Sequence, residues 1–151
     1  PEEEAANARA KVFDIGLLAQ RLEGAIGEAD RFVGDPATPV GLFGASTVAA
    51  AALVAGASLG SKIAAIVCRG GRPDLAGAAL PKVTAPTLLI VGGEDREVLA
   101  LNRQAQRRLR NLNALEVIPG ASHLFPEAGA MERVVALTLD WFERYLSKNP
   151  V

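Results

Sequence analysis

Four short apolar runs, separated by segments of helical pattern, constrain the fold of this chain more than any other feature. They cover residues 40–43, 63–68, 87–91 and 115–118. The second run reads Ile-Ala-Ala-Ile-Val-Cys and is apolar at every position, as expected of a strand buried on both faces. Such strands, alternating with helices, predict an α/β fold. We expect a parallel sheet of about four strands, with consecutive strands side by side and helices on both faces.

Helical periodicity accounts for most of the remaining chain. Residues 2–29, 47–59, 97–109 and 130–147 are predicted helices, and residues 75–80 are a short helix or an irregular link. The expected inward-facing residues are Val12, Ile15, Leu18, Leu22 and Ile26 in the first helix, Val98, Leu101, Ala105 and Leu109 in the third, and Val134, Val135, Thr138, Trp141, Phe142 and Tyr145 in the last.

Composition and charge narrow the classes of function. The chain has 151 residues, 50% of them hydrophobic, and a formal net charge of −1, so it has no overall field to recruit nucleic acid or an anionic membrane. No apolar stretch approaches the length of a bilayer span, and the opening Pro-Glu-Glu-Glu is unlike a signal peptide. Cys68 has no partner cysteine, which fits a reducing compartment. We predict a cytoplasmic protein with no nucleic-acid or membrane partner.

The stretch Gly44-Ala45-Ser46-Thr47 joins the first strand to the next helix without a loop. A turn this sharp exposes a serine at its apex, and the N–H groups that open the helix stabilise developing negative charge. The alternative is that Gly44 ends a strand and Ser46 only caps a helix. This stretch alone leaves both interpretations open.

Three polar residues follow expected strands in the chain order serine, aspartate, histidine. Ser46, Asp95 and His123 each come just after a strand, and the carboxyl ends of parallel strands meet at one edge of a sheet. An imidazole can take the proton of a serine hydroxyl, and a carboxylate fixes the imidazole tautomer. Singly, Asp95 would be a turn or cap residue and His123, the only histidine, a solvated one. Together they favour a catalytic triad.

Residues 40–146 resemble the C-terminal half of an α/β-hydrolase, most closely the lidless dienelactone-hydrolase-like esterases. Thr-Leu-Leu-Ile-Val-Gly-Gly-Glu-Asp, ending at Asp95, is similar to the acid-bearing loop of that family. Ile-Pro-Gly-Ala-Ser-His, ending at His123, is similar to its histidine loop, and Gly-Ala-Ser-Thr-Val to its nucleophile turn. The resemblance implies hydrolysis of small esters or lactones by Ser46, Asp95 and His123, without a metal or organic cofactor. The N–H of Thr47 is the expected oxyanion donor.

The chain departs from that family in two respects. Val48 replaces the last glycine of the Gly-x-Ser-x-Gly pattern, so a β-branched side chain must find room or shift the turn. The first strands of the family's sheet are also missing, together with the loop that donates the second oxyanion N–H. We interpret residues 1–151 as a single, partial domain with residues 1–33 as an N-terminal helical segment. The apolar edge at residues 40–43 is then expected to pair in a homodimer or with a missing N-terminal half.

Several alternatives stay open. A non-catalytic fragment or pseudoenzyme of the same fold is the main one. A dinucleotide-binding module is disfavoured because the chain lacks Gly-x-Gly-x-x-Gly. Arg69 and Arg72 are candidates for binding a substrate carboxylate or phosphate, although arginine is ordinary in a loop beside two glycines. The basic residues at positions 103, 107, 108 and 110 are interpreted as a solvated helix face.

Overall fold

The computed structural model describes residues 13–147, which form a parallel sheet with helices on both faces. Its strands lie in the order β1-β2-β3-β4. They span Val40–Ala45 (β1), Ile63–Arg69 (β2), Thr87–Gly92 (β3) and Asn113–Ile118 (β4). All three neighbouring pairs are parallel, which confirms the predicted fold class and strand order.

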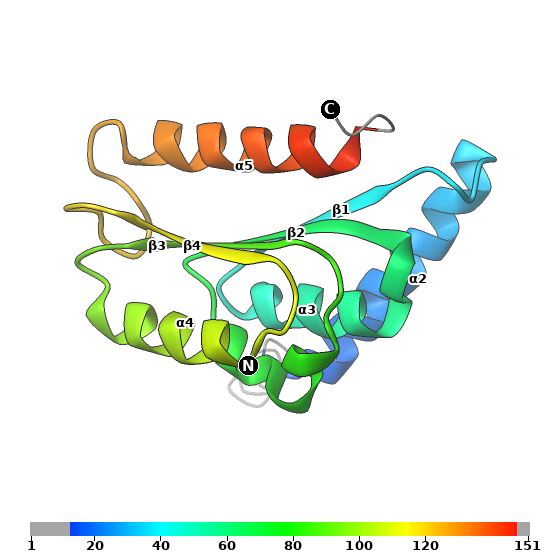
Figure 1. Cartoon of the computed structure of the whole chain (residues 1–151), viewed down its shortest axis with the longest axis horizontal. Helices are drawn as coiled ribbons and strands as arrows, with labels where there is room; N and C mark the ends of the chain where they lie inside the picture. Colours follow the sequence, from blue (N-terminus) through cyan, green and yellow to red (C-terminus); the bar gives the residue numbers. More distant parts are fainter. Residues whose placement is uncertain (1–12, 148–151) are drawn as a thin grey trace, which may run out of the picture.

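The helices divide unequally between the two faces of the sheet (Figure 1). Ile15–Val33 (α2), Thr47–Leu59 (α3) and Arg96–Arg108 (α4) lie on one side, and Ala130–Leu146 (α5) covers the other. Of two 3₁₀ segments, Gly60–Lys62 (η1) joins α3 to β2 and Pro73–Lys82 (η2) joins β2 to β3. The part of the first predicted helix at residues 2–12, with Val12, lies outside the described residues.

The core consists of two apolar layers separated by the sheet. Ile66 and Cys68 of β2 face α3, whereas Ala65 and Val67 face α5, as the alternation of a strand requires. All six residues of β3 are buried. Helix α3 approaches the sheet very closely, because a Cβ on Gly56 would lie 2.5 Å from Ile66 Cδ1. Its many alanines allow this short distance.

Two predicted helix faces differ from the structure. In α4 the buried residues are Leu99, Asn102 and Ala105. Of the residues predicted to face inward, Ala105 and Leu109 are buried, and Val98 and Leu101 are partly buried. A polar Asn102 is tolerated inside because its amide donates to the carbonyls of Gly71 (3.0 Å) and Val98 (2.8 Å).

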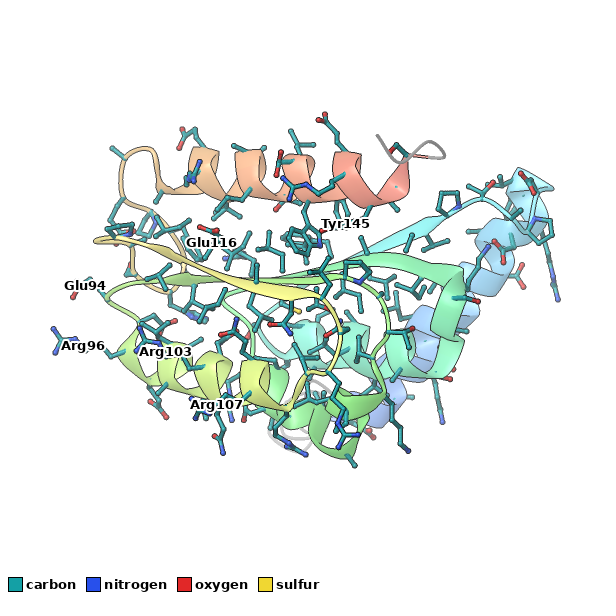
Figure 2. All side chains as sticks on the ribbon, in the orientation of Figure 1. Glu94, Arg96, Arg103, Arg107, Glu116 and Tyr145 are labelled. Atoms are coloured by element: carbon teal, nitrogen blue, oxygen red, sulfur yellow. The ribbon has the colours of Figure 1, made fainter. Side chains whose placement is uncertain are left out.

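In α5, Val134 and Trp141 are buried but Val135 is 50% exposed. The prediction that Val135 faces inward was therefore wrong. Consecutive helical residues point about 100° apart, which turns Val135 away from the sheet. Tyr145 lies between α5 and the sheet, with its ring centroid 4.8 Å from that of Trp141 (Figure 2). Within residues 13–147, no helix is both long and apolar enough to cross a bilayer.

Candidate active site

Ser46 occupies the turn between β1 and α3 in a conformation that L-amino acids rarely adopt, with φ 53° and ψ −127°. Its N–H donates to Arg69 O (3.3 Å), and its carbonyl accepts from the N–H groups of Ala49 (3.2 Å) and Arg72 (3.1 Å). The Ser46 side chain makes no capping hydrogen bond to α3. A role as a helix cap therefore does not explain this serine, whose backbone is fixed by β2 and by the loop after it.

The space around the turn explains Gly44 and accommodates Val48. A Cβ on Gly44 would lie 2.6 Å from the Cα and 2.8 Å from the N of Ala49, so only glycine fits under the start of α3. Val48 is 43% exposed, and its side chain points away from this contact. The β-branched residue has found room, and the sharp turn is formed without the last glycine of the pattern.

Asp95 and His123 are joined directly. The Nδ1 atom of His123 lies 2.6 Å from Asp95 Oδ2, and the Asp95 side chain is 14% exposed against 44% for His123. Asp95 begins α4 without capping it, so its carboxylate is directed to the imidazole. Because Nδ1 must carry the proton to bond an ionised carboxylate, Nε2 is left as the acceptor nitrogen.

The loops after β3 and β4 are held against each other. The N–H of Gly93 donates to Ile118 O (2.8 Å), and that of Glu94 donates to Ala121 O (3.0 Å). A Cβ on Gly92 would lie 2.7 Å from Ser122 O, so the two loops are in contact at the backbone. These contacts fix Asp95 and His123 relative to each other, although they are 28 residues apart.

Gly70 and Gly71, which follow β2, lie close to the histidine and to the serine turn, respectively. A Cβ on Gly70 would be 3.6 Å from Nδ1 and Cε1 of His123, and one on Gly71 would be 3.6 Å from Ser46 O. The bond from Asn102 to Gly71 O supports this loop from beneath. Gly70 thus lies next to His123 and Gly71 next to Ser46, and within residues 13–147 no hydrogen bond joins the Ser46 hydroxyl to His123.

The other predicted site residues are also placed. Thr47 is buried and is the first residue of α3, where backbone N–H groups lack an intrahelical partner. The Arg72 guanidinium is engaged by both carboxylate oxygens of Asp74, each at 2.9 Å, which raises the pKa of Arg72. Arg69 instead lies over the Phe125 ring, 5.6 Å from its centroid. Neither arginine is hydrogen-bonded to Ser46, Asp95 or His123 through its guanidinium in the described residues.

Sequence reasoning missed Glu127, which lies in the histidine loop. Its Oε1 accepts the Ser122 N–H at 3.0 Å, and this bond lowers the pKa of Glu127. Phe125 in the same loop is 2% exposed and has φ 56°. Neither residue belongs to a recognisable motif, so only the folded loop reveals them. In the described part of the chain, no group of three or more histidine, cysteine, aspartate or glutamate residues is arranged to hold a metal ion.

A parallel α/β sheet with a serine at a strained strand-to-helix turn and a His–Asp pair at the same edge has the architecture of an α/β-hydrolase. The chain belongs to the alpha/beta hydrolase family, whose model matches residues 4–137. This finding confirms the resemblance predicted from the sequence.

Solved structures support the same fold. The dienelactone hydrolase of Anabaena variabilis is 50% identical with a TM-score of 0.88, over 97% of this chain and 69% of that one. A predicted CIB-like hydrolase of Thermoplasma acidophilum is 21% identical, with a TM-score of 0.66 over 87% of this chain and 60% of that one, and shows the fold alone.

Two curated relatives from Mycobacterium tuberculosis, strains CDC 1551 / Oshkosh and ATCC 25618 / H37Rv, are 53% identical over 146 residues. Both are named "Putative phosphoribosyl transferase". The match covers 97% of this chain but only 32% of each relative, so the chain spans about a third of their length.

Proposed function

We propose that this chain carries the catalytic residues of a serine hydrolase that acts on small carboxylic esters or lactones. The observation that carries the proposal is the 2.6 Å bond from His123 Nδ1 to Asp95, at the same sheet edge as the strained Ser46 turn. Strain of this kind persists where the surrounding structure holds it, and functional sites are a common location. The 50% identity to a dienelactone hydrolase supports the substrate class.

The proposed reaction follows from the atoms available. Ser46 Oγ attacks the acyl carbon while His123 Nε2 takes the hydroxyl proton, and Asp95 stabilises the resulting imidazolium. The imidazolium then gives the proton to the leaving alkoxide, and an acyl group remains on Ser46. Water attacks this acyl group with His123 again as the base, which frees Ser46 and releases the acid.

The negative oxygen of the tetrahedral intermediate needs donors close to Ser46. We assign the N–H of Thr47 to this role, because it lies in the first turn of α3 next to the nucleophile. One donor stabilises this oxygen less than two, and removal of a donor lowers the rate on the order of 10²–10³-fold.

The alternative is a non-catalytic member of the family. It is favoured by the lack of a hydrogen bond between the Ser46 hydroxyl and His123 in residues 13–147. Catalytic hydrogen bonds are often long before substrate binds, so this geometry does not decide against the hydrolase. The transferase name of the curated relatives applies to proteins about three times as long and assigns no activity to this third of them.

Hydrolysis of p-nitrophenyl acetate by the purified chain tests the proposal. We expect Ser46→Ala and His123→Ala to lower kcat/KM on the order of 10³-fold or to the background rate. The exposed Arg107 on α4 supplies a control, because Arg107→Gln leaves the site untouched (Figure 2). Wild-type activity that survives in Ser46→Ala would overturn the assignment of the nucleophile.

A further inference from the structure

The loop between β4 and α5 carries His123, although it is neither helix nor strand. An imidazole that must reach both Asp95 and a serine needs a well-defined backbone, since misplacement by about 1 Å costs on the order of 10²-fold in rate. On the Asp95 side, the N–H groups of Gly93 and Glu94 donate to carbonyls at the start of this loop. The contacts on the other side of the loop come from Glu127.

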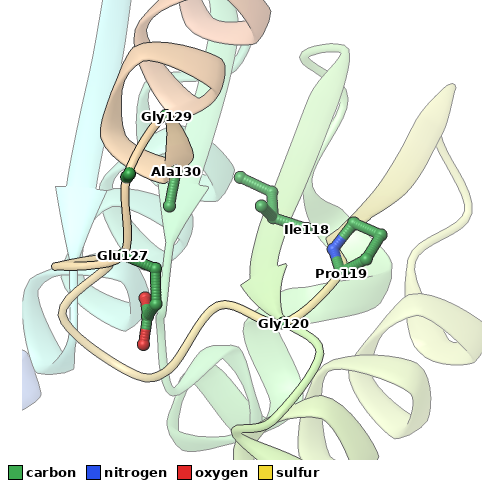
Figure 3. A pocket seen from close by; sticks show the side chains of 7 residues that line it. Ile118, Pro119, Gly120, Glu127, Gly129 and Ala130 are labelled. Carbon is green, nitrogen blue, oxygen red and sulfur yellow. The ribbon is translucent and has the colours of Figure 1, made fainter.

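The Glu127 carboxylate lies inside the curve of the loop (Figure 3). Its Oε1 accepts the N–H of Ser122, the residue before His123, at 3.0 Å. Its Oε2 is buried and has no hydrogen-bond partner in the described structure. The carboxylate borders a pocket of about 370 Å³ between the loop and the start of α5, lined also by Ile118, Pro119, Gly120, Ala128, Gly129 and Ala130.

Glu127 is itself fixed to the core through α5. Its carbonyl accepts the N–H of Ala130 at 3.0 Å, in the first turn of that helix. The helix is held in place by the buried side chains of Val134 and Trp141. A short chain of bonds therefore runs from the apolar core through Glu127 to the Ala121–Ser122 peptide, one residue before His123.

Phe125 completes the loop on the side of β2. It is almost fully buried, and its N–H donates to Ser122 O at 3.2 Å. The Arg69 guanidinium covers its ring. The peptide units on both sides of Ser122 are thus bonded within the loop, one to a main-chain donor and the other to a side-chain carboxylate.

We propose that Glu127 is a positioning residue for His123, which it holds toward Ser46 through the Ser122 N–H. This inference rests on the proposed hydrolase function. A carboxylate suits the role because a hydrogen bond to an ionised acceptor is shorter and stronger than one to a neutral acceptor. Glu127 contacts neither Asp95 nor the imidazole through a hydrogen bond, so its action is indirect.

Three variants test this inference: Glu127→Ala, which removes the acceptor, Glu127→Gln, which keeps a neutral one, and Glu132→Ala, an exposed glutamate of α5, as the matched control. We expect Glu127→Ala to lower kcat about tenfold with KM unchanged. Glu127→Gln should stay within about threefold of the wild type, because its amide oxygen still accepts the Ser122 N–H.

A second readout does not depend on activity. His123 is the only histidine of the chain, so an NMR spectrum shows a single imidazole. We expect its Nδ1 proton, sheltered by Asp95, to give a sharp signal in the wild type and in Glu127→Gln, and to broaden or vanish in Glu127→Ala. An inactive wild type with this pattern contradicts the hydrolase but supports the positioning role.

An unchanged imidazole signal together with unchanged kcat in Glu127→Ala overturns the inference. If the alanine variant fails to fold, as judged by circular dichroism, Glu127→Asp takes its place. The side chain of aspartate is one methylene shorter and cannot reach the Ser122 N–H from the same backbone. A sharp signal and unchanged kcat in this variant contradict the inference equally.

Discussion

At the scale of single residues, Ser46, the proposed nucleophile, has an unfavourable backbone conformation. A non-glycine residue at φ 53° and ψ −127° costs on the order of 1–3 kcal/mol. Ser46→Gly should therefore raise the free energy of unfolding by about 1 kcal/mol. Ser46→Ala retains the Cβ and should leave stability nearly unchanged. Urea denaturation of both variants measures the difference, and equal stabilities would show that the turn is unstrained.

Cys68 is a buried thiol that should be unreactive in the folded chain. Burial among α3 and the sheet raises the pKa of Cys68 to about 12, so almost no thiolate is present at neutral pH. We expect a thiol reagent such as DTNB to label Cys68 rapidly in about 6 M guanidinium chloride, where the chain is unfolded, and very slowly in buffer. Fast labelling of the native chain would contradict the packing of β2 against α3.

The hydrogen bond to Ser122 lowers the pKa of Glu127, and this has a consequence for stability in acid. A carboxyl group whose pKa is lowered by folding adds stability above its unfolded pKa of about 4.3. That contribution disappears as the pH falls through the folded pKa. We expect the stability gap between wild type and Glu127→Gln, measured by denaturation, to be constant near neutrality and to shrink below about pH 4. A gap independent of pH would contradict the bond.

At the scale of elements, two glycines should respond oppositely to the same substitution. A Cβ on Gly44 would collide with the backbone of Ala49, so Gly44→Ala should destabilise the chain by about 1–3 kcal/mol or prevent folding. A Cβ on Gly24, inside α2, has nothing within 4 Å. Gly24→Ala should stabilise the chain by about 0.5–1 kcal/mol. Thermal unfolding of both variants is the measurement, and a stable Gly44→Ala would contradict the close approach of α3.

Elements with a strong apolar pattern were predictable from the sequence. The bounds of α3 match the prediction, and the strands differ from it by a few residues at most. The burial of Asn102 in α4 was not predictable, because an asparagine is expected at the surface until the fold brings Gly71 O next to its amide. Contacts between segments distant in the chain determine whether such a residue is buried, and these contacts cannot be inferred from helical periodicity.

The site could be predicted in part for the same reason. Ser46, Asp95 and His123 follow from strand ends and from their residue types, and the structure bonds Asp95 to His123 as expected. Gly70 and Glu127 could not be found in this way. Their contacts with the loop of His123 depend on the distance between segments of the folded chain, which the sequence does not state.

At the scale of the whole molecule, β1 is an edge strand of the sheet that residues 13–147 form. Phe43 on this strand is 48% exposed and lines an apolar groove of about 270 Å³ with Arg69, Met131, Val134, Val135, Thr138 and Leu139. Open apolar edges tend to pair with other strands. We propose that a second copy of the chain covers this edge, with the two β1 strands antiparallel about a twofold axis.

Light scattering across a concentration series tests the pairing of the edge. We expect a dimer in the wild type and a monomer in Phe43→Lys, because a lysine on an edge strand opposes strand addition. Arg107→Gln should remain dimeric, because Arg107 is on α4, on the face of the sheet opposite to α5. A wild-type chain that stays monomeric at all concentrations would contradict the proposal.

Covalent labelling of the chain by a fluorophosphonate tests most directly whether Ser46 is an activated nucleophile, because the reagent needs an activated serine and no particular substrate. Intact mass spectrometry followed by peptide mapping is the readout. We expect one adduct on Ser46 in the wild type, strongly reduced in His123→Ala and absent in Ser46→Ala. An unlabelled wild type, or an adduct that persists in Ser46→Ala, would contradict it.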